Sequence, residues 1–277
     1  MVLNCHKVRV DYQQSSSRKK WTIQRREQVG DESLSLNIES FSVQIGTHTA
    51  ILGANGAGKS TLLKAVSGDV SYDGELNILG EERRSWQSHH LARYVAVLPQ
   101  NTQLSFSFTV REVVGLGLYK SALNLRQQHE VMKAIMQQVD VENLAERSFP
   151  TLSGGQQQRV LFAKALCQIA SIDQGAQQYS QKLLLLDEPI AALDVFHQHQ
   201  LLQSVAEITQ RSGTVISVLH DLNLAARYCD RLVLMHQGQI IADGTPEMVL
   251  TEDNISCAYG YKSSVIRHPE QGYLMVS

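Results

Sequence analysis

The sequence predicts an α/β protein with an N-terminal antiparallel β subdomain and a helical subdomain inserted into a parallel-sheet core. Apolar runs at residues 182–186 and 214–219 are typical of buried central strands, because parallel strands are covered on both faces. Alternating apolar residues at 8–12 and 34–45 favour β-strands near the N-terminus. Residues 101–156 show helical spacing instead and predict the inserted helical subdomain.

In chain order, the first predicted strand is followed by polar residues 13–32, for which an elongated hairpin and a mobile loop both remain open. The second strand leads into a short apolar strand at 48–52, and residues 61–66 begin a helix. In the insertion, Thr109 is the expected cap of one helix, and a second helix covers about 126–139.

After the insertion, strands and helices alternate to about Asp230. The polar residues 170–181 predict a surface excursion between them. Two short apolar runs, joined at 236–238, read as a hairpin. Thr245 and Pro246 then predict a helix start, since proline is favoured at the first helical position.

Composition narrows the function classes. The 277 residues suit one domain over 1–277, and 43% hydrophobic residues are enough for a core. A net charge of −2 gives no bulk attraction to nucleic acid or anionic membrane. We see no run of about 18 apolar residues and no signal peptide. Four dispersed cysteines, without a CxxC pair, predict reduced thiols rather than a zinc or redox site: Cys5, Cys167, Cys229 and Cys257.

A complete Gly-x-x-x-x-Gly-Lys-Ser pattern lies between the strand at 48–52 and the following helix. Its glycines allow successive backbone N–H groups to face one phosphate chain. Lys59 adds positive charge at the β- and γ-phosphates, and Ser60 supplies a hydroxyl for Mg²⁺. The expected nucleotide-binding residues are Gly53, Ala54, Asn55, Gly56, Ala57, Gly58, Lys59, Ser60 and Thr61.

Two carboxylates end the buried strand at 182–186. In parallel sheets ligands bind at the carboxyl ends of strands, so Asp187 and Glu188 are expected beside the phosphate loop. Asp187 is a candidate for holding Mg²⁺ through its water shell, and Glu188 for polarising the attacking water as a general base.

A second glycine pair begins a helix in the segment Leu152, Ser153, Gly154, Gly155 and Gln156. Its N–H groups and the Ser153 hydroxyl predict another anion site, which one nucleotide per chain does not need. We therefore expect it to serve the nucleotide of another subunit. An ordinary serine cap of the helix is the alternative.

Two single residues complete the candidate catalytic set. Gln100 follows the strand ending at Pro99 and could ligate Mg²⁺ or the attacking water. His220 follows the strand at 214–219 and could reach the γ-phosphate. The other nine histidines are interpreted as structural, because no carboxylate or cysteine accompanies them at metal-ligand spacing.

Together these motifs resemble the ATP-binding subunit of ABC transporters, a P-loop NTPase fold, over nearly the whole chain. The resemblance adds a D-loop at 191–194, which begins with Ala191 where the family usually has serine but retains Asp194. It implies a homodimer that sandwiches two ATP between the phosphate loop of one subunit and Ser153 of the other. An adenine-stacking aromatic residue is also implied, with Tyr12 favoured over Trp21.

Finer similarity, over residues 91–110, 219–228 and 242–246, is to the hemin-importer ATPases of Gram-negative bacteria. It implies an ATPase on the cytoplasmic face of the inner membrane, bound to two integral-membrane permease subunits and served indirectly by a periplasmic heme-binding protein. Importers of ferric siderophores or cobalamin are the alternative cargo class. Two other functions are less favoured: a non-transport ABC protein in translation or DNA repair, and a regulator that binds ATP without turnover.

Overall fold

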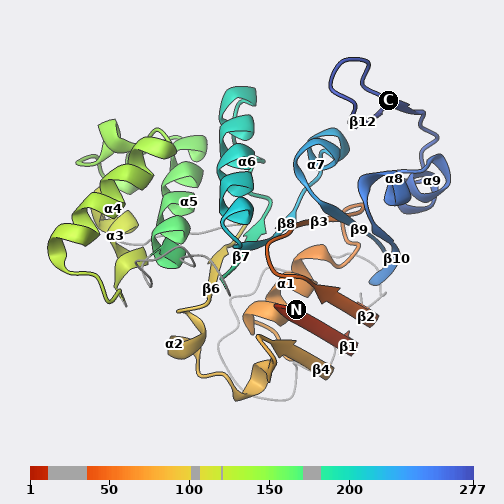
Figure 1. Ribbon diagram of the computed structural model, residues 1–277, viewed down its shortest axis with the longest axis horizontal. Helices are drawn as coiled ribbons and strands as arrows, with labels where there is room; N and C mark the ends of the chain where they lie inside the picture. The colour runs from red at the N-terminus through yellow and green to blue at the C-terminus, as the bar shows by residue number, and fades with distance from the viewer. Residues whose placement is uncertain (12–35, 101–106, 120, 171–181) are drawn as a thin grey trace, which may run out of the picture.

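The computed structural model describes residues 1–11, 36–100, 107–119, 121–170 and 182–277. A central sheet separates one group of helices from a smaller sheet, and a helical subdomain extends to one side (Figure 1). Tyr12, Trp21 and residues 171–181 of the excursion predicted at 170–181 lie outside the described residues. In the described part of the chain, no helix has both the length and the hydropathy that crossing a membrane requires.

The described part of the central sheet has six strands in the order β10-β9-β3-β8-β7-β6. Pairs among β9, β3, β8, β7 and β6 are parallel, whereas β10 pairs antiparallel with β9. This register places Leu98 beside Leu186 and Asp187 beside Val218. The ends of β6, β7 and β8 therefore meet at one edge. The strands are β3 His48–Leu52, β6 Val95–Leu98, β7 Leu183–Asp187, β8 Thr214–Val218, β9 Arg231–His236 and β10 Gln239–Gly244.

The run of leucines in β7 shows why this sheet needs cover on both faces. Successive strand side chains point to opposite faces. Leu184 and Leu186 join the core cluster that includes the helices α5 and α6, while Leu183 and Leu185 join the cluster beneath α1 and the N-terminal sheet. All four are fully buried, as the sequence predicted for a central strand.

The N-terminal subdomain is an antiparallel sheet in the order β2-β1-β4-β5. Its first strand starts at Leu3, earlier than the predicted 8–12, and its second corresponds to the predicted 34–45. The strands are β1 Leu3–Val10, β2 Leu36–Val43, β4 Asp73–Ile78 and β5 Glu81–Glu82. Their apolar faces pack with α1, Lys59–Ser67.

The helical insertion is confirmed between β6 and β7, and it continues through α5. Thr109 and Asn124 form capping boxes with Glu112 and Gln127, which fixes where two of its helices start. Its elements are α3 Val110–Gly115, η3 Leu116–Leu118, α4 Leu125–Gln138, η4 Glu142–Leu144, η5 Phe149–Thr151 and α5 Gly154–Ala170.

The remaining elements follow the predicted alternation and confirm the hairpin of β9 and β10 and the helix starting at Pro246. They are η2 Arg83–Ser85, α2 Ser88–Leu91, α6 Val195–Gln210, α7 Leu222–Tyr228, α8 Pro246–Val249, α9 Glu252–Tyr259, β11 Val265–Arg267 and β12 Leu274–Val276. The four cysteines lie in the described residues, and none of them is in a disulfide.

Candidate functional site

The phosphate loop joins β3 to α1 in a backbone conformation that needs its glycines. Gly53, Gly56 and Gly58 have φ angles of 143°, 82° and 97°, a region that L side chains rarely adopt. A Cβ at Gly53 would lie 2.3 Å from the carbonyl oxygen of Met235 in β9. The loop therefore lies directly against the sheet, with Asn55 and Gly56 exposed at its tip and Thr61 in the first turn of α1.

Lys59 and Ser60 start α1, as the motif predicted. The Lys59 Nζ donates to the carbonyl oxygens of Gly53 and Ala54, at 2.8 and 2.9 Å. Burial lowers the pKa of Lys59, while the nearby Glu188 and Asp187 carboxylates oppose that shift. The ammonium group is thus held inside the loop, where a phosphate chain would replace its carbonyl partners.

The Ser60 hydroxyl donates to Asp187 Oδ1 at 2.9 Å, which joins the phosphate loop to the end of β7. Burial raises the pKa of Asp187, and the bond from Ser60 partly offsets this. Among the described residues, no cluster of three or more His, Cys, Asp or Glu side chains could hold a metal. A hydroxyl beside one carboxylate instead fits Mg²⁺, which proteins bind through few ligands together with substrate phosphates and water.

Glu188 is the centre of the predicted catalytic set. Its Oε1 lies 2.8 Å from His220 Nε2, and its carboxylate also accepts a hydrogen bond from Gln100. Burial raises the pKa of Glu188, but the bonds from His220 and Gln100 and nearby positive charge outweigh it, so the net shift is downward. The structure thus brings together residues from the ends of β6, β7 and β8 around an ionised carboxylate.

Glu188 also has a φ angle of 51°, which is uncommon for a residue other than glycine. With this backbone angle, the Glu188 side chain reaches His220. Sequence patterns do not reveal such a backbone angle. In this arrangement the Gln100 amide contacts Glu188, so its role as a metal ligand stays a prediction.

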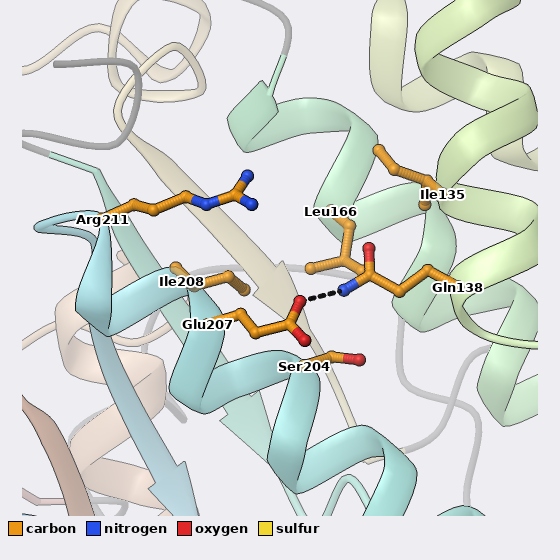
Figure 2. Close-up of a pocket in the computed structure, with 7 residues that line it drawn as sticks. All are labelled: Ile135, Gln138, Leu166, Ser204, Glu207, Ile208 and Arg211. Atoms are coloured by element: carbon orange, nitrogen blue, oxygen red, sulfur yellow. Dashed lines mark hydrogen bonds between the residues drawn. The ribbon is translucent and has the colours of Figure 1, made fainter. Parts of the chain in front are cut away.

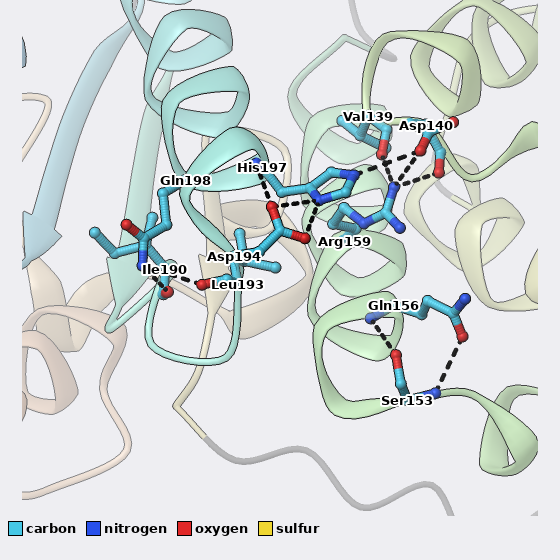
Figure 3. A network of polar contacts seen from close by, with 10 residues as sticks. All are labelled: Val139, Asp140, Ser153, Gln156, Arg159, Ile190, Leu193, Asp194, His197 and Gln198. Carbon is cyan, nitrogen blue, oxygen red and sulfur yellow. Dashed lines mark hydrogen bonds and ion pairs between the residues drawn. The ribbon is translucent and has the colours of Figure 1, made fainter.

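The Ser153 segment caps α5. Gln156 N–H donates to Ser153 Oγ at 3.3 Å, and Ser153 N–H donates to Gln156 Oε1 at 3.1 Å (Figure 3). The ordinary cap weighed from the sequence is therefore present. A Cβ at Gly155 would lie 2.8 Å from the Ala192 carbonyl oxygen. The second glycine thus allows close approach of the loop after Glu188, and the anion site of Gly154 and its neighbours stays a prediction.

Asp194 caps α6 in this structure. It accepts the backbone N–H of His197 at 3.0 Å, and both of its oxygens lie within 2.9 Å of His197 Nδ1. These bonds hold the pKa of Asp194 below its usual range. Its expected contact with nucleotide stays a prediction. Sequence reasoning missed a role for His197, because its second carboxylate contact, Asp140, lies 57 positions away in the chain.

Tyr259, at the end of α9, is a second residue that the sequence did not indicate. Its hydroxyl oxygen accepts the Gly53 N–H at 3.0 Å. A tyrosine 206 positions away from the loop carries no local signal. The C-terminal segment therefore contributes directly to the shape of the phosphate loop.

A phosphate loop, a hydroxyl–carboxylate pair and a carboxylate held by Gln100 and His220 define a P-loop nucleoside triphosphatase. The family model described as ABC transporter matches residues 36–191. The chain belongs to the ABC transporter family and is an ATP-hydrolysing subunit of that family.

Curated relatives match most of the chain. The hemin import ATP-binding protein HmuV of Plesiomonas shigelloides is 42% identical over 245 residues, covering 86% of this chain and 94% of that protein. HmuV of Vibrio parahaemolyticus is 43% identical over 231 residues, covering 83% and 86%.

Solved structures agree with the fold at 22% identity. An inward-facing putative metal-chelate type ABC transporter has a TM-score of 0.73 and coverages of 100% and 97%. An ATP-binding cassette in its ADP conformation has a TM-score of 0.71 and coverages of 94% and 99%. The predicted fold class is confirmed.

Proposed function

We propose that this chain energises hemin import across the inner membrane as a peripheral subunit on its cytoplasmic face. The observation that carries the ATPase part is the convergence of Gln100, Glu188 and His220 beside the Ser60–Asp187 pair. The cargo rests on relatives named as hemin import ATP-binding proteins, which are 42–43% identical over 83–90% of the chain. Permeases for ferric siderophores or cobalamin are the alternative cargo systems.

In the proposed mechanism, Glu188 accepts a proton from the water that attacks the γ-phosphate. Its lowered pKa keeps it ionised, and His220 and Gln100 hold its orientation. Lys59 neutralises phosphate charge. Ser60 and Asp187 would hold Mg²⁺, which offsets charge on the phosphate oxygens.

The partner subunit is proposed to be a second copy of this chain. The glycine-rich start of α5 offers N–H groups and the Ser153 hydroxyl to an anion, and Ser153 already shares the helix cap with Gln156. In the homodimer, this segment would cover the nucleotide bound to the other copy's phosphate loop. Two ATP would then be enclosed between the subunits.

The permease subunits are proposed to contact the helical subdomain. Three large apolar side chains lie exposed between the end of α3 and the start of α4: Leu116 is 50% exposed, Tyr119 79% and Leu125 85%. Exposed apolar groups of this kind mark protein contact surfaces. A periplasmic heme-binding protein would act through the permease alone.

The ATPase role is tested by Glu188→Gln. We expect kcat to fall at least about a hundredfold with ATP binding retained, because the amide cannot accept the proton. When ATP is added, dimers of this variant should accumulate, which size-exclusion chromatography would measure. Glu252→Gln, at an exposed position in α9, is the control. Unchanged turnover in Glu188→Gln would remove Glu188 from the role of base.

The cargo is tested by uptake in cells that lack this chain. Cells complemented with wild type or Glu188→Gln are given labelled hemin, a ferric siderophore and cobalamin in parallel. Hemin uptake restored by wild type alone supports the proposal. If wild type restored uptake of the siderophore or of cobalamin instead, the chain would belong to the importer of that compound.

A further inference from the structure

Charged side chains from separate helices meet beside the loop that follows Glu188. His197, in the first turn of α6, has Nδ1 2.8 Å from Asp194 Oδ2 and Nε2 3.5 Å from Asp140 Oδ2 (Figure 3). Asp140 lies just beyond the end of α4. The imidazole therefore stands between two carboxylates, one at the start of α6 and one in the helical subdomain.

Arg159 extends this cluster to α5. Its Nη1 donates to Asp140 Oδ2 at 2.9 Å and to the carbonyl oxygen of Val139 at 3.1 Å. The side chain of Arg159 is 11% exposed and that of His197 is 18% exposed. The carboxylates of Asp140 and Asp194 are 57% and 67% exposed, so the cluster joins α4, α5 and α6 through several hydrogen bonds rather than through buried charge.

The loop at 189–193 is held between the same helices. Gln158 of α5 donates to the Pro189 carbonyl at 3.2 Å, and Gln198 of α6 donates to the Ile190 and Leu193 carbonyls at 3.3 and 3.1 Å. The loop begins directly after Glu188. A shift of α5 against α6 would therefore displace the chain that carries the proposed base.

Farther along α6 the junction is more open. A pocket of about 70 Å³ separates α6 from α4 and α5, and Gln138 Nε2 bridges it to Glu207 Oε2 at 3.1 Å (Figure 2). Its volume is well below the roughly 300 Å³ of small ligand sites, so it is a packing gap. The three helices share one hydrophobic core around this gap, and polar contacts such as the His197 cluster add to that core in setting where α6 lies.

We propose that His197 is a positioning residue for ATP hydrolysis. By joining Asp194 to Asp140 and Arg159, it holds the loop after Glu188 in place against α5, the helix that Ser153 caps. The proposal rests on the proposed role of Glu188 as general base. It assigns no contact between His197 and nucleotide.

The test measures kcat, KM and affinity for a fluorescent ATP analogue in the full-length chain. In His197→Ala we expect kcat to fall about tenfold, because a misplaced catalytic group slows chemistry. KM and nucleotide affinity should stay within about twofold of wild type, since the phosphate loop is untouched.

Asp140→Gly provides a second variant that keeps the fold. Asp140 has a φ angle of 53°, where glycine is favoured, so the carboxylate is removed without backbone cost. We expect the same loss of kcat with an unchanged melting temperature. Gln200→Ala is the matched control. It removes the hydrogen bond from Gln200 to the Gln138 carbonyl at 2.9 Å but retains the contacts between His197 and Asp194.

Wild-type kcat in Asp140→Gly would overturn the proposal, as would an equal loss of kcat in Gln200→Ala. Glu188→Gln is measured alongside. Turnover retained there would reject the base assignment separately from the result at His197.

Discussion

Replacing Gly53 with alanine tests whether the sheet shapes the phosphate loop. The φ angle of Gly53 is 143°, and an added Cβ would lie 2.3 Å from the Met235 carbonyl oxygen and 3.1 Å from the Ala57 Cβ. The first neighbour is backbone of the central strand β9, which cannot give way easily. The loop must therefore move away from the sheet, and its N–H groups with it.

The expected cost follows from these two contributions. A left-handed backbone costs an L residue about 1–2 kcal/mol. Forcing an extra group into a packed contact costs roughly 1–3 kcal/mol. Without nucleotide, the loop relieves this strain by shifting. Nucleotide binding must return the loop to its original conformation, so the strain lowers the binding affinity. A total of about 2–5 kcal/mol predicts ATP binding weakened by at least about 30-fold.

The assay is titration with a fluorescent ATP analogue, together with the melting temperature. Gly80→Ala is the control, because Gly80 has a φ angle of 86° but nothing within 4 Å of an added Cβ. It should lose about 1–2 kcal/mol of stability and keep its ATP affinity. Wild-type affinity in Gly53→Ala, or equal loss of affinity in both variants, would refute the reasoning.

Three further predictions concern other regions. Tyr259→Phe removes the acceptor of the Gly53 N–H, so the KM for ATP should rise about fivefold with kcat unchanged; steady-state kinetics would contradict this if kcat alone fell. Burial lowers the pKa of His48 from 6.5 to about 4. The folded protein therefore favours neutral His48, and the free energy of unfolding should fall by about 3 kcal/mol as the pH falls from 6.5 toward 4. Melting curves of His48→Gln should show a weaker acid dependence over that range, and an unchanged dependence would exclude His48 as its source. Tyr119→Glu should weaken copurification with the permease and leave ATPase activity intact. Loss of basal ATPase activity would show instead that Tyr119 is needed for the folded structure of the chain.

Much of the nucleotide site is visible in the sequence, because its parts are local. The phosphate loop needs glycines at fixed offsets, and the run of leucines before Asp187 and Glu188 predicts a buried strand that ends in carboxylates. Thr109 as a cap and Pro246 as a helix start depend on bonds within a few residues. The structure confirms these elements.

Other features depend on residues far apart in the chain. The Tyr259–Gly53 bond spans 206 positions, and the His197–Asp140 contact spans 57. Neither leaves a pattern in the neighbouring sequence. His197 was interpreted as an ordinary structural histidine, because its second carboxylate partner comes from another subdomain.

By itself, the sequence determined the class of chemistry: a phosphate loop, two carboxylates at a strand end, and Gln100 and His220 after neighbouring strands. Only the tertiary structure decided that Gln100 and His220 both bind Glu188, and that Glu188 takes a left-handed backbone angle to reach them. The physical reason is the parallel register of β6, β7 and β8. It sets the strand ends side by side, and no local propensity specifies it.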